Sequence, residues 1–401
     1  MKKISLFLIS LSLLIVFNNT FRWYQNSENN VFQFGDWLMN YQGGFVRRGF
    51  FGEIFFRIYE ITNISPPLII LIFLFFLYLL FGIYFFKLLK KVQFNHLIIF
   101  SLFSPLAFFF PVFNSVASAK KEILFFLTLT LVCYFLPKIN KKYYSYIFFI
   151  SCSLLTLTHE GYLFYFAYLF IPFFLLLNPR KFYEIKNFSA LTFVLITFLS
   201  LLMYNFMGTE EKIFAICNSI KEFVYATCGS YGPIHARNID SYLSENWVKD
   251  LVYIRSYSLY FLLGFLPLSI LHLNSTLEVS IFQKKFNSFI LLILPFIITL
   301  PIYYLALDWG RWLNISYMSS LIIFIFLINN NFIKLKNYKS FSNNIYLKRV
   351  LISLVFVIYC FGWTVPICCN PEIKGGLYRT VKLGISSYER HGFELPEYFF
   401  K

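Results

Sequence analysis

A succession of long, almost uninterrupted apolar runs constrains the fold of this sequence more than any other feature. We identify about eleven such runs, most of them close to the roughly 17–25 residues that carry a helix across the hydrocarbon core of a bilayer. They cover residues 4–18, 67–87, 96–113, 122–137, 143–159, 161–178, 188–207, 253–273, 287–307, 312–330 and 349–367. In hydrocarbon a chain must satisfy its own backbone hydrogen bonds, so the runs are predicted to be helices. The sequence therefore predicts an all-α, polytopic transmembrane bundle that forms one integral membrane domain over residues 1–401.

The overall composition agrees with this prediction. The chain is 58% hydrophobic and only 13% charged, whereas soluble domains carry about 25% charged residues. The first run follows Met1-Lys2-Lys3, as in a signal peptide, but no small-x-small cleavage site comes after it. We therefore expect a retained span rather than a removed signal.

The distribution of basic residues predicts the orientation of the bundle. If the N-terminus lies inside, the inner segments hold enough Lys and Arg to account for the whole net charge of +16, and the outer segments are balanced. Excess Lys and Arg in short inner loops is the usual topology signal of membrane proteins. We therefore expect a membrane protein with its N-terminus inside and its C-terminus outside. The charge then indicates anionic membrane lipids rather than nucleic acid as its counterpart.

Three hydrophilic stretches are long, and all three fall on the predicted outer side: 19–65, 208–252 and 368–401. Two cysteines of the second stretch, Cys217 and Cys228, lie where an oxidising compartment permits a disulfide. The sequence does not decide whether they pair with each other, pair with Cys368 or Cys369, or stay free. The spacing of the cysteines is unlike that of a zinc site.

The first outer stretch contains a Gly-rich segment, residues 35–53, with Asp36, Arg47 and Arg48 in it. Glycines allow sharp turns and close approach of the backbone to a ligand. Adjacent arginines offer planar donor forks that match phosphate or carboxylate. The segment that follows, residues 50–59, is apolar around most of its face and is predicted to lie in the outer interface or to re-enter the membrane. We favour a substrate site here over a lipid anchor, because an anchor does not need Asp36 or the glycines.

Two further segments place ionisable groups at the ends of spans. Lys120 and Lys121 precede Glu122 at a predicted helix start, where cations oppose the helix dipole. This placement indicates either an anionic partner such as a diphosphate or lysines that reach lipid headgroups. His159 and Glu160 separate two apolar runs in a predicted tight hairpin. They are candidates for proton transfer, with a simple capping pair as the alternative.

The remaining candidates lie toward the C-terminal half. Asp308 and Arg311 flank an outer span end and are spaced to pair with each other. The middle outer loop adds His235, Arg237 and Asp240, for which an ordinary loop surface is the stronger interpretation. No Walker loop, dinucleotide fingerprint, HExxH or GxSxG motif occurs. We therefore expect no cofactor, no metal, and a substrate that arrives already activated.

This layout resembles the bacterial O-antigen and exopolysaccharide polymerases of the Wzy type, particularly their exopolysaccharide branch. The resemblance rests on the acidic and Gly-rich stretch 36–49, on Lys120-Lys121-Glu122 followed by a span, an inner loop at 137–142 and a second span that ends at His159, and on the outer loop 208–252. The chain departs from the family in having a Lys pair where Arg-Gln is usual and in having Glu160 after the histidine.

The resemblance implies polymerisation of oligosaccharide repeat units carried on undecaprenyl diphosphate, at the outer face of the inner membrane, for O-antigen, capsule or exopolysaccharide biosynthesis. Other polysaccharide-assembly membrane proteins would be its partners. A lipid diphosphate as leaving group requires clustered cations near the outer interface. The corresponding candidates for substrate contacts are Arg47, Arg48, Lys120, Lys121, Arg237, Asp308 and Arg311. The candidate catalytic bases, any of which would activate the attacking hydroxyl, are Asp36, His159 and Glu160.

Two other functions stay open at this point. A multi-span glycosyltransferase of the GT-C type, which uses a polyprenyl-phosphate sugar, would employ an acid in the first outer loop, such as Asp36. A transporter or flippase would carry ionisable residues near the middle of its spans. Here the ionisable residues lie at span ends instead, which makes transport the weaker alternative.

Overall fold

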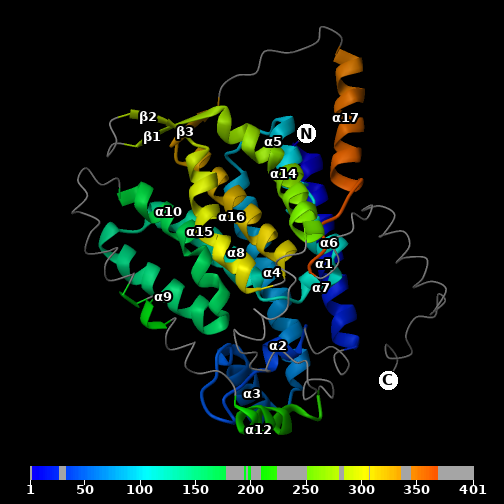
Figure 1. Ribbon diagram of the computed structural model, residues 1–401, viewed down its shortest axis with the longest axis vertical. Helices are drawn as coiled ribbons and strands as arrows, with labels where there is room; N and C mark the ends of the chain where they lie inside the picture. Colours follow the sequence, from blue (N-terminus) through cyan, green and yellow to red (C-terminus); the bar gives the residue numbers. More distant parts are fainter. Residues whose placement is uncertain are drawn as a thin grey trace, which may run out of the picture.

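The computed structural model describes residues 2–26, 33–177, 194–195, 197–199, 209–223, 251–279, 284–306, 308–335 and 345–368. In these residues the chain folds mainly into helices that pack side by side (Figure 1). The longer helices are α1 (Lys2–Gln25), α3 (Phe50–Thr62), α4 (Pro66–Leu89), α8 (Glu122–Phe135), α9 (Tyr144–Thr158), α10 (Phe166–Leu177), α12 (Glu210–Ile220), α14 (Leu251–Leu273), α15 (Ile290–Leu305), α16 (Trp309–Asn329) and α17 (Ile345–Phe361). Short helices are α2 (Gly35–Leu38), α5 (His96–Leu102), α6 (Phe110–Phe113) and α7 (Ser115–Ser118), and a 3₁₀ helix, η4 (Glu160–Tyr165), precedes α10.

Five segments of the described chain are helical, long and apolar enough to cross a membrane: Lys2–Gln25, Pro66–Leu89, Glu160–Leu177, Tyr253–Leu273 and Trp309–Asn329. Two shorter apolar helices, Ile290–Leu305 and Val350–Phe361, accompany them. The prediction of a helical membrane bundle is confirmed at this level. Each predicted run contains a helix, apart from run 188–207, most of which lies outside the described residues.

One predicted span, 96–113, is not continuous. Its helix α5 begins at the Asn95 cap, whose side chain accepts from the Ile98 amide at 2.9 Å, and ends at Leu102. Pro105 follows shortly and has no amide hydrogen to continue a helix. Ser104 instead donates to the Gly264 carbonyl at 3.2 Å and is fully buried. Irregular backbone is tolerated at membrane depth where it is enclosed by protein, and this break lies inside the bundle.

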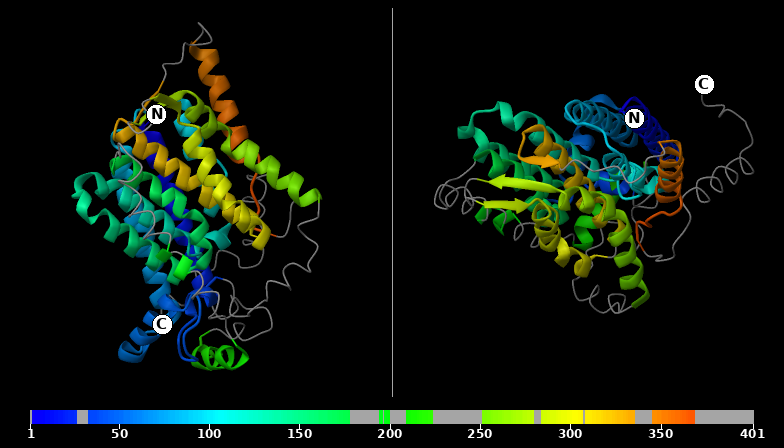
Figure 2. Two further views of the ribbon diagram at one scale, coloured as in Figure 1. Left: turned by 60° about the vertical axis from the view of Figure 1, so that its left-hand side comes forward. Right: turned by 90° about the horizontal axis from the view of Figure 1, so that it is seen from above.

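A small antiparallel sheet, in the order β2-β1-β3, is the other departure from the all-α prediction. Strand β1 (Ser275–Val279) pairs with β2 (Lys284–Asn287) and with β3 (Ile333–Leu335). The register of the second pairing joins Ser275 to Leu335 and Leu277 to Ile333. The connections that follow α14 and α16 are thereby joined at one end of the bundle (Figure 2).

The connecting segments gather at two ends of the bundle. At the end that we name the strand end, Lys2 donates to the Lys90 carbonyl at 2.6 Å, and Asn329 donates to the Leu88 carbonyl at 2.7 Å, beside the three strands. At the opposite end, which we name the charged end, the indole of Trp37 donates to the Ala119 carbonyl at 2.7 Å. Helices α2, α3 and α12 lie at this end, at the bottom of Figure 1.

Helix α16 is the central helix of the bundle (Figure 1). In its most apolar stretch 89% of the residues are buried, against 33–56% in the other four candidate spans. It contacts α4, α8, α10, α14 and α15. Its buried polar side chains therefore face protein rather than lipid, and Arg311 in its first turn is among them.

Candidate functional site

The charged end brings together side chains from four separate parts of the sequence. Nine of the ten candidate site residues lie there and form two connected groups of ion pairs or pack between them: Asp36, Arg47, Arg48, Lys120, Lys121, His159, Glu160, Asp308 and Arg311. We call this set, together with Glu122, the charge cluster. The tenth candidate, Arg237, lies outside the described residues, as do His235 and Asp240.

The first group of ion pairs is centred on Glu160. Its carboxylate accepts from the Arg47 guanidinium at 3.1 Å and from Nε of Arg48 at 2.8 Å. The Glu160 side chain is 24% exposed, and the two arginines are 21% and 20% exposed. A ligand that reaches the charged end can therefore contact these three side chains directly. The capping alternative holds for His159, whose side chain accepts from the Gly161 amide at the start of η4. Glu160 instead pairs with two arginines of the first stretch, and a functional role for either residue stays a prediction.

The Gly-rich segment turns sharply enough to present both arginines to Glu160. Gly44 has a φ of +94° and Arg48 has a φ of +63°, which is the left-handed region that favours glycine. Gly52 is also required by packing, because a Cβ atom at that position would lie 1.7 Å from the Met39 carbonyl oxygen. The backbone strain at Arg48 is balanced by contacts of its guanidinium and of its carbonyl, which accepts from Nζ of Lys121 at 3.4 Å.

Lys121 connects this group to the interior of the bundle. Its side chain is 1% exposed, and Nζ lies 3.5 Å from a carboxylate oxygen of Asp36. It also donates to the Thr158 carbonyl at 3.4 Å and lies 5.5 Å from the Trp37 ring centroid. Burial lowers the pKa of Lys121 to about 8, although Asp36 opposes that shift. The anionic partner expected for the lysine pair is thus, for Lys121, an aspartate of the same chain.

Asp36 is held as a carboxylate between cations. Besides Lys121, the guanidinium of Arg48 lies 3.7 Å from it. Burial would raise the pKa of Asp36, but Lys121 and Arg48 together hold it below its ordinary value. Oδ1 of Asp36 has no hydrogen-bond partner within the described residues. Asp36 is therefore charged at neutral pH, and its Oδ1 faces the Arg48 guanidinium as an ion pair without a hydrogen bond.

The second group of ion pairs joins α8 to α16. Arg311 donates from Nε to Glu122 at 2.6 Å, and a second guanidinium nitrogen contacts the same carboxylate oxygen. It also pairs with Asp308, which confirms the expected pairing of these two residues. Glu122, which the sequence indicated only as a helix-start acid, is thus the main partner of Arg311. An acid directly after two lysines was a signal that could have placed it in the site.

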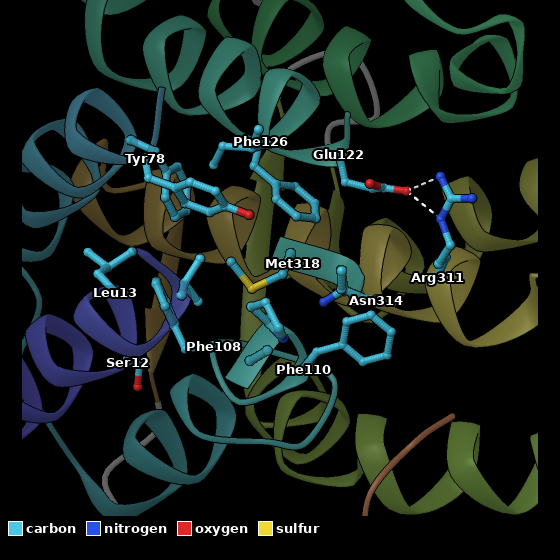
Figure 3. Close-up of a pocket in the computed structure, with 16 residues that line it drawn as sticks. Ser12, Leu13, Tyr78, Phe108, Phe110, Glu122, Phe126, Arg311, Asn314 and Met318 are labelled. Atoms are coloured by element: carbon cyan, nitrogen blue, oxygen red, sulfur yellow. Dashed lines mark hydrogen bonds and ion pairs between the residues drawn. The ribbon is translucent and has the colours of Figure 1, made fainter. Parts of the chain in front are cut away.

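A cavity of about 40 Å³ lies beside this second group, between α1, α4, α8 and α16. Figure 3 shows its mostly apolar lining, with the Glu122–Arg311 pair on one side. Oε2 of Glu122 has no hydrogen-bond partner within the described residues. The cavity is large enough for water but small for a sugar.

His159 completes the charge cluster. The ring is buried, with Tyr162 at 5.3 Å and Trp312 at 6.1 Å between ring centroids. Nδ1 accepts from the Gly161 amide at 3.0 Å. Burial and the nearby Arg48 lower the pKa of His159 well below its ordinary value. The imidazole is therefore neutral at physiological pH.

The cysteines and possible metal ligands add little to the cluster. Cys217 is disulfide-bonded, and its partner lies outside the described residues; Cys133, Cys152 and Cys360 are free and buried, as expected for packing residues. Among the residues that the structure describes, no group of three or more His, Cys, Asp or Glu side chains is arranged to hold a metal ion.

What the cluster can do chemically follows from its parts. Five cations and four carboxylates meet at one end of an apolar bundle, and at least three of these groups are partly exposed. Guanidinium groups bind phosphate as readily as carboxylate, and a released carboxylate can accept a proton.

Comparison with known proteins identifies no family: no protein-family profile matches this chain, and no curated protein or solved structure matches it.

Proposed function

We propose that this protein is a membrane glycosyltransferase that polymerises oligosaccharide repeat units linked to a lipid diphosphate, at the outer face of the bacterial inner membrane. The observation that carries the proposal is the meeting of Arg47, Arg48 and Lys121 with Asp36 and Glu160 at one end of an apolar helical bundle. A substrate that is anionic, lipid-borne and already activated fits such a site, because its energy is stored in the bond to the diphosphate.

In this proposal the charged end faces outward and the strand end faces the cytosol. The bundle then crosses the membrane about eleven times, from an inner N-terminus to an outer C-terminus. Support comes from the basic residues of the strand end, among them Lys90, Lys91 and Lys138, which are exposed. Exposed Lys near the ends of spans is typical of the cytosolic face.

The arginines would bind the diphosphate by exchanging partners. Arg47 and Arg48 share Glu160 in the structure, so their donors are oriented before substrate arrives. A diphosphate offers several acceptor oxygens and more charge than one carboxylate, and it would take over these donors. Glu160 would then lose the cations that weaken it as a base.

The released carboxylate would serve the chemical step. A hydroxyl of the acceptor chain attacks the anomeric carbon of the donor unit, and the carbon–oxygen bond to the diphosphate breaks. The bonding electron pair leaves on the diphosphate oxygen, where arginine stabilises it. The hydroxyl proton passes to a carboxylate, for which Glu160 and Asp36 are the candidates. The electrostatic field around the diphosphate would be set by three further groups: Lys120, Asp308 and Arg311. The outer loop with Arg237 would contact the glycan.

A single-sugar transferase of the GT-C type is the second candidate. The observation in its favour is Asp36, a charged and incompletely hydrogen-bonded acid that belongs to the first connection of the charged end. Purified protein with a labelled polyprenyl-phosphate sugar separates the two, because a polymerase would leave this donor unused and a GT-C enzyme would consume it.

The test of the proposal is complementation of a gene deletion in the native host. Deletion should remove long surface glycan and leave single repeat units on the lipid carrier, as seen by gel and mass spectrometry. Wild-type protein should restore long chains, whereas Arg48→Ala should lower polymer yield about a hundred-fold, since loss of one charge-stabilising donor costs that much.

Arg57→Ala is the matched control, because Arg57 follows on α3, is 58% exposed, and pairs only with Glu53 and Glu60 among the described residues. It should restore long chains fully at equal membrane abundance. Repeat units that lack one sugar would indicate the single-sugar transferase instead. An unchanged glycan profile after deletion would exclude both enzymes.

A further inference from the structure

The hydrogen bond at Nδ1 determines the tautomer of His159. The Gly161 amide donates to Nδ1 at 3.0 Å, so Nδ1 must present a lone pair. A neutral imidazole carries one proton on one of its two nitrogens. With Nδ1 as the acceptor, that proton lies on Nε2. Nε2 is then a donor and has no lone pair with which to take a proton.

The surroundings hold the ring in this orientation. A Cβ atom at Gly161 would lie 3.0 Å from Nδ1 and 3.2 Å from Cδ1 of Ile302, so the backbone passes directly over the ring. Tyr162 and Trp312 contact the ring as well. A 180° rotation of the ring would put Cδ2 in the place of Nδ1 and leave the Gly161 amide without its acceptor, at a cost of about 1–3 kcal/mol for a buried donor.

Burial keeps the ring neutral. It is the main cause of the lowered pKa of His159; Arg48 and Arg311 lower that pKa further, and the carboxylates of Glu160 and Asp36 oppose the shift. The imidazolium form would also lose the bond from Gly161, because both ring nitrogens would then be donors. Within the described residues, no group accepts a hydrogen bond from Nε2.

We propose that His159 donates a hydrogen bond from Nε2 to an anionic oxygen of the substrate and does not act as the general base. The identity of that oxygen rests on the proposed function: it would be the diphosphate oxygen that gains negative charge as the glycosidic carbon departs. The proton stays on Nε2 throughout, and the hydroxyl proton goes to a carboxylate. Both the sequence and the resemblance made His159 a base candidate, and this proposal gives it the role of a donor instead.

Three substitutions separate a donor from a base. His159→Gln keeps an amide donor near the position of Nε2 but cannot act as a base. His159→Glu offers a base without a donor, and His159→Ala offers neither. If His159 is a donor, Gln should keep polymer yield within about tenfold of wild type, and Ala and Glu should lose about a hundred-fold. A Gln variant as inactive as Ala, or a Glu variant more active than Gln, would overturn the proposal.

A second measurement needs no substrate and so stands apart from the proposed function. Nitrogen-15 NMR of histidine-labelled full-length protein in lipid nanodiscs reports the tautomer of each imidazole, and the signal that disappears in His159→Gln assigns His159. We expect the Nε2–H tautomer at pH 7. A proton on Nδ1, or an imidazolium at pH 7, would overturn the inference even if the protein proved to be a polymerase. If the protein shows the expected tautomer but has no polymerase activity, Nε2 of His159 remains a donor and the proposed function is wrong.

Discussion

The two ends of the bundle bury polar groups in different ways. At the charged end, cations are withdrawn from solvent: Lys121 is 1% exposed and Arg311 is 7% exposed. At the strand end, the lysines that predict topology, such as Lys90 and Lys138, remain exposed. Burial of a charge is costly unless it is paired, whereas an exposed lysine costs little. The comparison distinguishes buried, paired cations from exposed ones.

The two ends also differ in the charge of their buried side-chain contacts. The strand end contains a buried neutral group in which His272 contacts Ser288 at 2.9 Å and Ser275 contacts Ser288 at 2.5 Å. These residues are 16 and 13 positions apart, and they join α14 to the start of α15. At the charged end, Arg48 and Glu160 are 112 positions apart, and Arg311 and Glu122 are 189 apart. The difference lies in charge rather than in reach, because the Asn329–Leu88 bond of the strand end spans 241 positions.

The largest expected effect comes from breaking the buried ion pair of α16. Arg311→Met should lower the free energy of unfolding by about 3–5 kcal/mol, because it leaves Glu122 charged and unpaired in the interior. Thermal unfolding in detergent micelles measures the change, with Arg57→Met as the exposed control, for which we expect under about 1 kcal/mol. Adding Glu122→Gln to Arg311→Met should recover much of the loss. Equal shifts for Arg311→Met and Arg57→Met would show that burial adds nothing to the contribution of the Arg311 ion pair to stability.

A smaller effect is expected from pH at Lys121. Its pKa in the folded protein is about 8, below its ordinary value of 10.5, so above about pH 8 the unfolded chain binds more protons than the folded one. Stability linked to Lys121 should therefore rise between pH 8 and pH 10.5. The measurement is the difference in unfolding temperature between wild type and Lys121→Met, followed from pH 7 to pH 10. A difference that stays flat across this range would mean that the pKa of Lys121 is not lowered.

The smallest effect is expected at the strand end. Lys90→Gln and Lys91→Gln alter exposed side chains, and each should change the free energy of unfolding by less than about 0.5 kcal/mol. Glycan length in the complemented deletion strain should be unchanged. If either lysine variant lost as much polymer as Arg48→Ala at equal protein abundance, functional residues would lie at both ends. The two ends would then not differ in function.

The sequence predicted the helical bundle and the residues of the charge cluster better than the contacts that these residues make with one another. Apolar length alone predicts α1, α4 and α14, because hydrocarbon admits little except helices. Arg48 and Glu160 each stood out through an unusual local context. That they contact each other depends on how α3 and α9 pack, and no local pattern contains that information.

The departures from the sequence prediction have identifiable causes. The break after α5 is signalled by Ser104 and Pro105, but the surrounding apolar residues masked it within a run of span length. The hydrogen bond from the Gly161 amide to His159 was not predicted, because composition does not reveal backbone direction. Glu122 was interpreted through the helix dipole alone, because its partner Arg311 lies on a helix far along the chain.

The central position of α16 has a consequence for biosynthesis. Residues 309–329 are synthesised after α4, α8, α10, α14 and α15, yet they are the helix against which all five pack. A chain still on the ribosome therefore holds Glu122 in the membrane before Arg311 has been translated. The earlier helices must wait in a loose arrangement, open enough to admit a late helix laterally.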